Sequence, residues 1–241
     1  MQLKDYHILI IGGNSEIGKN NATHIIKEGG TVHFSARDIN AIENLRSIYG
    51  NKHFYYQTSL SNQEEINDFI KTITIKLNGV IFATGESQLI AARMINERML
   101  DRLIHSNFKI PVLVTKSLFK NKKLLENASL LYYTSVSYQK HFVGNTIYSS
   151  AKIALSNYVK SLATELIYTK IRVNSIAPGF VFTKSYLKFD NEYIKLLKNH
   201  HPRGFTSPDE VSKVCIFLLS EASSGIHGQE IIIDGGYSIK L

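Results

Sequence analysis

Strand-like and helix-like segments alternate along the whole chain, and this alternation limits the possible folds more than any other feature. Helices that connect consecutive strands predict a parallel sheet covered by helices on both faces. Residues 63–76 are typical of the helical segments because their apolar side chains recur on one face, and Ser61 followed by Glu64 predicts a capping box. Seven segments have the pattern of short buried strands: 7–11, 31–35, 53–56, 79–83, 129–134, 171–176 and 230–233. We therefore predict an α/β fold with a doubly wound sheet of about seven parallel strands flanked by helices.

The length and composition suit a single domain. The 241 residues, 44% of them apolar, suffice for one large core over residues 1–241, and no repeat or linker divides them. No apolar run approaches the roughly 18 residues of a membrane helix, and no secretion signal is present, so we predict a cytoplasmic protein without membrane contact. Cys215 is the only cysteine. We expect it to be a buried core thiol, and we predict no disulfide and no metal site.

The charge is strongly basic, with a formal value of +8 from 28 basic and 20 acidic residues. The lysines are scattered, which is typical of a solvated surface, although a basic balance can also attract an anionic cofactor or substrate. No basic and aromatic stripe accompanies the charge, so we predict no nucleic-acid partner. Residues 184–201 do not follow the strand and helix rhythm, and we predict that they form a lid over a pocket. Four lysines of this segment would favour an acidic carrier protein or a phosphorylated sugar as the substrate. The alternative is that they face solvent. They are Lys184, Lys188, Lys195 and Lys198.

A glycine-rich turn, residues 12–18 (GGNSEIG), follows the first predicted strand and precedes a predicted helix. Glycine allows the backbone to turn sharply and to approach a pyrophosphate, while amide groups at a helix start face the anion. Such a turn can also simply join a strand to a helix, so the motif alone does not decide the function. If it binds a dinucleotide, we expect contacts from Gly12, Asn14, Ser15, Ile17 and Gly18.

The cofactor preference depends on the residues after the second predicted strand. Arg37 follows Ser35 and Ala36, where the chain would reach the adenosine ribose. An acidic residue there binds the ribose hydroxyls of NAD, whereas an arginine accommodates the 2′-phosphate of NADP. Because no acid occupies positions 35 and 36, we predict NADP(H) over NAD(H), with a plain surface arginine as the alternative.

Tyr148 and Lys152 lie four residues apart in a predicted apolar helix and therefore share one helix face. A phenol ionises near pH ~10, and a neighbouring ammonium lowers that pKa, so the pair can exchange a proton near neutral pH. A tyrosine and a lysine at this spacing have no such role in most proteins. Here Ser135, at the end of the fifth predicted strand, would meet them at the carboxyl edge of the sheet and could donate to a substrate oxygen.

With these motifs, the chain resembles the short-chain dehydrogenase/reductase family over essentially its whole length. Asn107, residues 174–179 (NSIAPG) and residues 234–236 (DGG) match the family pattern as well. The similarity is strongest to members that resemble 3-oxoacyl-[acyl-carrier-protein] reductase. The resemblance implies a single NAD(P)-binding Rossmann-fold domain and a homotetramer or homodimer, built partly through the helix that carries Tyr148.

The resemblance also implies roles for individual residues. Tyr148 would be the general acid in reduction and the base in oxidation, and Ser135 would orient the substrate oxygen. Lys152 would hold the nicotinamide ribose and lower the Tyr148 pKa, while Asn107 would hold a water molecule in a proton relay behind it. Further cofactor contacts are implied for Ser59, Ala83, Gly85, Tyr148, Pro178, Gly179, Val181 and Thr183.

The chain departs from the family pattern around the cofactor. Ile11 replaces a threonine, Glu16 replaces the middle glycine of the turn, and Ser59 stands where an aspartate often binds the adenine amino group. Residues 82–85 (FATG) replace a segment whose asparagines usually tie the central sheet together. These changes bear on cofactor affinity and local rigidity and leave the proton-transfer residues intact.

The sequence therefore predicts an NADP(H)-dependent oxidoreductase that interconverts a carbonyl and a secondary alcohol, mainly in the reducing direction. Its substrate would be a small-molecule or carrier-bound carbonyl compound. The alternative is a catalytically silent NADP(H)-binding sensor or scaffold on the same fold. The intact set of Asn107, Ser135, Tyr148 and Lys152 disfavours that alternative.

Overall fold

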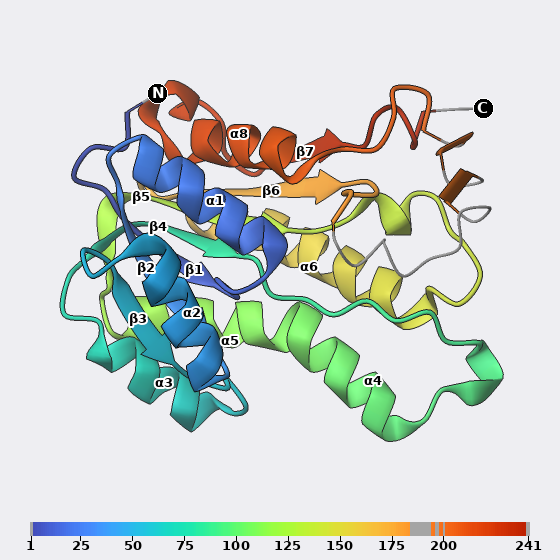
Figure 1. Cartoon of the computed structure of the whole chain (residues 1–241), viewed down its shortest axis with the longest axis horizontal. Helices are drawn as coiled ribbons and strands as arrows, with labels where there is room; N and C mark the ends of the chain where they lie inside the picture. Colours follow the sequence, from blue (N-terminus) through green and yellow to red (C-terminus); the bar gives the residue numbers. More distant parts are fainter. Residues whose placement is uncertain (1, 184–193, 196–197, 200, 240–241) are drawn as a thin grey trace.

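The computed structural model describes residues 2–183, 194–195, 198–199 and 201–239. In this part of the chain, seven strands form one parallel sheet in the order β3-β2-β1-β4-β5-β6-β7 (Figure 1), which confirms the predicted fold class. The strands are β1 (His7–Ile11), β2 (Thr31–Ala36), β3 (Phe54–Gln57), β4 (Leu77–Phe82), β5 (Leu124–Tyr133), β6 (Arg172–Pro178) and β7 (Glu230–Ile233). Strand β5 begins at Leu124, before the predicted start at residue 129. The sequence pattern missed this first part because Glu126 and Asn127 are exposed and interrupt the run of apolar residues.

Helices cover both faces of the sheet, as Figure 1 shows. One apolar core joins the sheet to α1, α2 and α8, and the other joins it to α3, α5 and α6. Cys215 is fully buried in α8, as predicted. The helices are α1 (Glu16–Lys27), α2 (Ile39–Tyr49), α3 (Gln63–Thr72), α4 (Glu97–Ile104), α5 (Ile110–Lys120), α6 (Thr146–Glu165) and α8 (Pro208–Leu219).

The strand order reverses between β1 and β4, at the middle of the sheet. From β1 the chain continues to β2 and β3 on one side, and from β4 it continues to β5, β6 and β7 on the other. The last residues of the two central strands, Ile11 and Phe82, are register partners. In open parallel sheets a ligand binds beyond the carboxyl ends of the strands at such a reversal.

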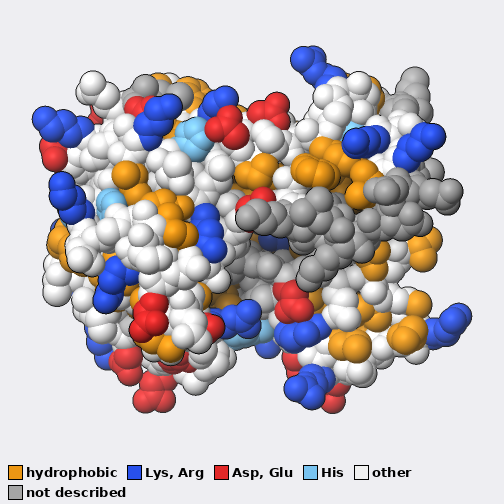
Figure 2. Space-filling model, viewed as in Figure 1, with side chains coloured by type: hydrophobic (Ala, Val, Ile, Leu, Met, Phe, Trp, Pro, Cys, Tyr) orange, Lys and Arg blue, Asp and Glu red, His pale blue; other side chains and the backbone are white. Residues whose placement is uncertain are grey.

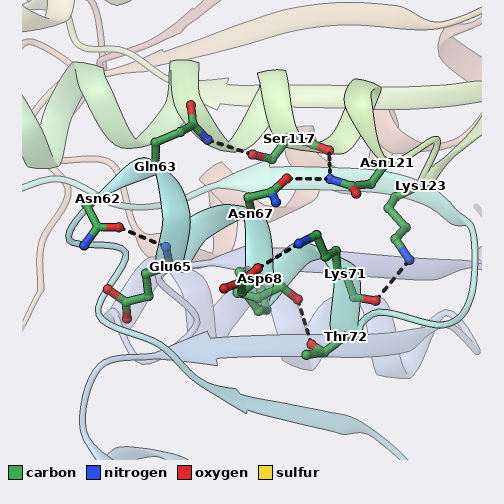
Figure 3. Close-up of polar contacts among 11 residues, drawn as sticks. Asn62, Gln63, Glu65, Asn67, Asp68, Lys71, Thr72, Ser117, Asn121 and Lys123 are labelled. Atoms are coloured by element: carbon green, nitrogen blue, oxygen red, sulfur yellow. Dashed lines mark hydrogen bonds and ion pairs between the residues drawn. The ribbon is translucent and has the colours of Figure 1, made fainter.

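The start of α3 differs from the predicted capping box. Asn62, not Ser61, is the N-cap, and its Oδ1 accepts a hydrogen bond from the Glu65 amide at 2.9 Å (Figure 3). The predicted pair of Ser61 and Glu64 is therefore wrong by one residue. The Glu65 carboxylate accepts hydrogen bonds from the amides of Ser59 and Ser61, which ties the loop before α3 to its first turn.

Polar contacts add to the apolar packing of α3 against α5 (Figure 3). Gln63 Nε2 donates to Ser117 Oγ at 3.0 Å, and Asn121 Nδ2 donates to Asn67 Oδ1 at 3.0 Å. Both bonds join residues 54 positions apart in sequence. They hold α5, and the turn that precedes it, at a defined place beside the sheet.

A buried histidine lies in the sheet, within β2. His33 is 1% exposed and stacks on Phe54 with the ring centroids 4.3 Å apart. Its ring nitrogens lie 3.1 Å from His7 Nδ1 and 3.1 Å from the Tyr56 hydroxyl. Burial, followed by the charges of His7 and His53, lowers the pKa of His33 from 6.5 to about 3. His33 is therefore neutral in the folded protein at neutral pH.

His33 should make stability depend on pH: we expect its contribution to the free energy of unfolding to fall by about 2 kcal/mol from pH 7.5 to pH 5. The unfolded chain takes up a proton near the ordinary histidine pKa, whereas the folded chain resists protonation down to about pH 3, so stability is lost as the pH falls below 6.5. Urea unfolding of His33→Gln at both pH values should show a smaller decrease than the wild type does. His141→Gln, at an exposed loop position, should keep the wild-type decrease. An equal decrease in His33→Gln would contradict this account.

Candidate active site

The glycine-rich turn connects β1 to α1 at the carboxyl edge of the sheet. Gly12 has a φ of +86°, and a Cβ atom there would lie 2.9 Å from Ala83 O. A Cβ atom on Gly18 would lie 2.6 Å from Gly12 O. Ser15 caps α1, because its Oγ accepts a hydrogen bond from the Gly18 amide at 3.0 Å. The turn therefore excludes side chains at both glycines, and the first amides of α1, which lack acceptors within the helix, can bind an anion.

A cavity of about 470 Å³ lies at this edge of the sheet. Its lining comes from the residues that follow β1, β4, β5 and β6 and from α6. The volume is in the usual range for a small-molecule or cofactor site. Gly12, Asn14 and Gly18 belong to the turn beside the cavity. The predicted site residues that line it are Ser15, Ile17, Ala83, Gly85, Ser135, Tyr148, Lys152, Pro178, Gly179, Val181 and Thr183.

Helix α6 carries Tyr148 and Lys152 one turn apart, and both residues line the cavity. Lys152 is 3% exposed, and its Nζ lies 5.6 Å from the centroid of the Tyr148 ring. The same Nζ donates a hydrogen bond to Tyr133 O at 2.7 Å. Ser135 lies two residues after the end of β5, and its Oγ accepts a hydrogen bond from the Ser137 amide at 3.1 Å. The structure thus brings Ser135, Tyr148 and Lys152 together at one cavity wall.

The pKa of Tyr148 differs from the expectation that Lys152 lowers it. Burial raises the pKa of the Tyr148 phenol above its ordinary value of 10.0, and a hydrogen bond with Ser135 offsets only part of this rise. Burial also lowers the pKa of Lys152 from 10.5 to about 8. The loss of hydration therefore outweighs the attraction between phenolate and ammonium. Tyr148 is protonated at neutral pH and can act as a proton donor.

Asn107 lies in a single π-helical turn, His105–Lys109, between α4 and α5. It is fully buried, and its Nδ2 donates to Glu86 O at 2.8 Å. Its Oδ1 has no hydrogen-bond partner among the described residues. A Cβ atom on Gly85 would lie 2.7 Å from this Oδ1 and 3.3 Å from Lys152 Nζ. Asn107 and Lys152 therefore both border Gly85, an arrangement compatible with the predicted relay, and π turns are frequent at functional sites.

The adenosine end of the predicted site lies outside this cavity. Arg37 is exposed just after β2, whereas Ser35 is buried and its Oγ donates to Ile10 O at 3.2 Å. Ser59 Oγ donates to Glu65 Oε2 at 2.6 Å. Hydrogen bonds from Ser59, and then from Ser61, lower the pKa of Glu65 to about 2. The Ser59 hydroxyl donates to Glu65, but its lone pairs can still accept a hydrogen bond, so its predicted contact with an adenine amino group stays a prediction.

The residues after β6 form another wall of the cavity. A Cβ atom on Gly179 would lie 2.8 Å from Asp234 Cα, so the backbones pass too closely for a side chain. Val181 pairs with Thr206 in an isolated parallel bridge. This bridge holds the segment that carries Thr183 to the cavity.

Comparisons with known proteins identify the family. A family model described as enoyl-(acyl carrier protein) reductase matches residues 12–238. The chain is 30% identical to a 3-oxoacyl-[acyl-carrier-protein] reductase of Thermotoga maritima, over 99% of this chain and 100% of the relative. The chain belongs to the short-chain dehydrogenase/reductase family. This short-chain dehydrogenase/reductase is also 25% identical to a cyclopentanol dehydrogenase of Comamonas testosteroni, over 98% of each chain.

Solved structures of other short-chain dehydrogenase/reductases share its fold. One from Brucella melitensis, titled a glucose/ribitol dehydrogenase, has a TM-score of 0.91 at 19% identity, over 98% of this chain and 99% of that one. One from Mycobacterium ulcerans has a TM-score of 0.90 at 24% identity, over 100% of this chain and 92% of that one. At these identities the likeness concerns the fold alone.

Sequence reasoning missed several cavity residues of this short-chain dehydrogenase/reductase. Tyr133 and Thr134 line the cavity directly before Ser135, and the rule that placed Ser135 at the carboxyl edge could have found them. Thr84 and Ser87, in the loop after β4, line it as well. Thr84 Oγ1 is buried without a hydrogen-bond partner among the described residues, so it is available to a ligand. The hydrogen bond from Lys152 Nζ to Tyr133 O could not be predicted, because every residue has a backbone carbonyl and the sequence does not distinguish this one.

Other predictions concern metals, membranes and the lid. The described residues contain no group of three potential metal ligands, and none of their helices is long and apolar enough to cross a membrane. Of the lid predicted at 184–201, Lys184 and Lys188 lie outside the described residues, and Lys195 and Lys198 are exposed. The lid and the cytoplasmic location stay predictions.

Proposed function

We propose that this short-chain dehydrogenase/reductase, an oxidoreductase of alcohol and carbonyl groups, uses NADP(H) and works mainly as a carbonyl reductase. The observation that carries the proposal is the convergence of Ser135, Tyr148 and Lys152 on a cavity that residues of the glycine-rich turn also line. The names of two relatives support the substrate class, since one is a cyclopentanol dehydrogenase and the other a 3-oxoacyl-[acyl-carrier-protein] reductase. A small ketone and a carrier-bound oxoacyl group are therefore both candidate substrates.

The residues at the cavity fit a dinucleotide. Gly12 and Gly18 leave room only for backbone, and the amides at the start of α1 suit a pyrophosphate. Thr84 offers a buried hydroxyl that has no partner within the described chain. Arg37 would bind the 2′-phosphate. The neighbouring Asp38 caps α2, because its Oδ1 accepts a hydrogen bond from the Asn40 amide at 3.0 Å. When bound, the nicotinamide would supply the hydride.

The protein's own residues manage the proton and the substrate oxygen. Tyr148 donates its hydroxyl proton to the carbonyl oxygen as that oxygen becomes negative. Ser135 donates a hydrogen bond to the same oxygen and so orients the carbonyl. Lys152, whose pKa is about 8, is mostly charged at neutral pH and stabilises the phenolate that remains. Because burial raises the pKa of Tyr148, the neutral phenol predominates at neutral pH, and this is the form that reduction of a carbonyl requires.

The test is turnover of NADPH with a panel of small ketones and an acetoacetyl thioester. We expect NADPH oxidation with at least one carbonyl compound and slower oxidation of NADH. The comparison between the ketones and the thioester separates a small-molecule reductase from one that acts on a carrier-bound group. Tight binding of NADPH without turnover of any compound would favour the scaffold alternative.

We also propose that the chain forms a homotetramer or homodimer partly through α6. Met94, Leu100, Val143 and Ile153 are exposed hydrophobic residues on or near α4 and α6. Figure 2 shows hydrophobic side chains at the end of the molecule where α4 lies. Such surface is typical of an interface rather than of a free helix. Light scattering should give two or four times the chain mass of 27.2 kDa, and a monomeric mass would contradict the proposal.

A further inference from the structure

A second cavity, of about 130 Å³, adjoins the catalytic residues. Ser135, Tyr148 and Gly179 line both this cavity and the larger one, so the two meet at the proton donor. A cavity of about 150 Å³ can hold benzene, so this one suits a group of about six non-hydrogen atoms. It is the natural place for the carbon skeleton of a substrate whose carbonyl reaches Tyr148.

Much of the wall of this cavity is apolar and aromatic. Phe180 packs edge-on against Tyr237 with centroids 6.0 Å apart, and it lies 5.9 Å from Phe142. Leu89 and Val136 add aliphatic surface. Among the described residues that line the cavity, none carries a charge. Because burying an unpaired charge is costly, the wall selects an uncharged substrate group.

Besides Ser135 and Tyr148, this wall contains two buried polar residues whose side chains have an unpartnered polar atom among the described residues. Ser137 and Asn145 are 4% and 3% exposed, and both line the cavity. Ser137 Oγ and Asn145 Nδ2 are buried without a hydrogen-bond partner in the described part of the chain. Leaving such a buried group unpaired destabilises the folded protein. A ligand in the cavity is the simplest source of the missing partners.

The backbone places both residues next to the catalytic groups. Ser137 lies in the short 3₁₀ helix that follows Ser135, and its amide donates to Ser135 Oγ at 3.1 Å. Asn145 is the N-cap residue of α6, three positions before Tyr148, but its side chain makes no capping hydrogen bond. Helix capping therefore does not explain an asparagine at this position.

We propose that Ser137 and Asn145 form a polar subsite that binds a second, uncharged oxygen of the substrate. An amide nitrogen only donates, and a hydroxyl donates or accepts, so together they suit a hydroxyl or carbonyl oxygen. The substrate class is then a compact ketone with an additional neutral oxygen near the reacting carbonyl. This inference rests on the proposed reductase function and narrows it.

The experiment compares ketones that differ only by a hydroxyl in place of a methyl group. One pair is 3-hydroxy-2-butanone and 3-methyl-2-butanone, and the other is 4-hydroxy-2-butanone and 2-pentanone. All four have six non-hydrogen atoms, and the pairs place the oxygen at different distances from the carbonyl. We expect the wild type to prefer at least one hydroxy ketone by roughly 10- to 100-fold in kcat/KM, because the methyl analogue leaves the buried groups unpaired.

Variants of the subsite should remove this preference. In Asn145→Leu and Ser137→Ala, the ratio of kcat/KM within the preferred pair should fall toward one, mainly through loss of the hydroxy ketone reaction. Ser150→Ala, at an exposed position near the start of α6, should keep the wild-type ratio. The ratio is informative because a general folding defect would reduce both members of a pair equally.

The possible failures are distinguishable. If the wild type reduces the methyl ketones as efficiently as the hydroxy ketones, the subsite is overturned and the reductase function stands. If both variants keep the preference, the subsite is likewise overturned. If none of the four ketones and no member of the wider panel is reduced, the proposed function fails and the subsite fails with it.

Discussion

Replacing Tyr148 by phenylalanine should reduce kcat for ketone reduction by roughly 100- to 10,000-fold, the usual contribution of a general acid. The substitution removes one hydroxyl and keeps the ring that lies 5.6 Å from Lys152 Nζ. Burial holds the phenol in its protonated form, so the wild type has a proton ready for the carbonyl oxygen. Ser135 can still orient that oxygen, but its hydroxyl is a much weaker acid than a phenol.

NADPH binding separates a chemical defect in this variant from a structural one. Fluorescence titration should give Tyr148→Phe an affinity close to that of the wild type, because the glycine-rich turn is untouched. Tyr168→Phe removes the same hydroxyl from a fully exposed residue beyond α6 and should leave kcat unchanged. Undiminished turnover by Tyr148→Phe would exclude Tyr148 as the proton donor.

Replacing Arg37 by glutamate should weaken NADPH binding by about 10- to 100-fold, because a charge-assisted hydrogen bond is worth about 1.5–3 kcal/mol. Arg37 is exposed directly after β2, where the 2′-phosphate would lie under the proposed function. A carboxylate at this position would repel that phosphate and could accept hydrogen bonds from the ribose hydroxyls of NADH. The affinity for NADH should therefore change little or improve.

The measurement is the ratio of NADPH to NADH affinity in each variant. Arg98→Glu makes the same charge change at an exposed position on α4 and should leave the ratio at its wild-type value. A ratio that does not move in Arg37→Glu would show that Arg37 is a surface arginine. The cofactor preference would then have to come from other residues.

The elements and the central residues of the candidate site could be predicted because their signals are local. A four-residue spacing puts Tyr148 and Lys152 on one helix face whatever the rest of the chain does. Ser135 could be placed because the carboxyl ends of parallel strands lie at one edge of a sheet. Element ends were less predictable, as the cap of α3 at Asn62 instead of Ser61 shows, because neighbouring polar residues compete for one capping position.

Periodicity and short spacings are enough to predict the parallel sheet, the glycine-rich turn and the residues that meet at its edge. The behaviour of each group at that edge depends on how the chain packs. Burial in the folded chain, not the neighbouring lysine, sets the direction of the Tyr148 pKa shift. Ser59 donates a hydrogen bond to the Glu65 carboxylate, and Ser137 Oγ and Asn145 Nδ2 have no hydrogen-bond partner among the described residues. Hydration and hydrogen-bond partners depend on which parts of the chain pack together, and no local pattern encodes that.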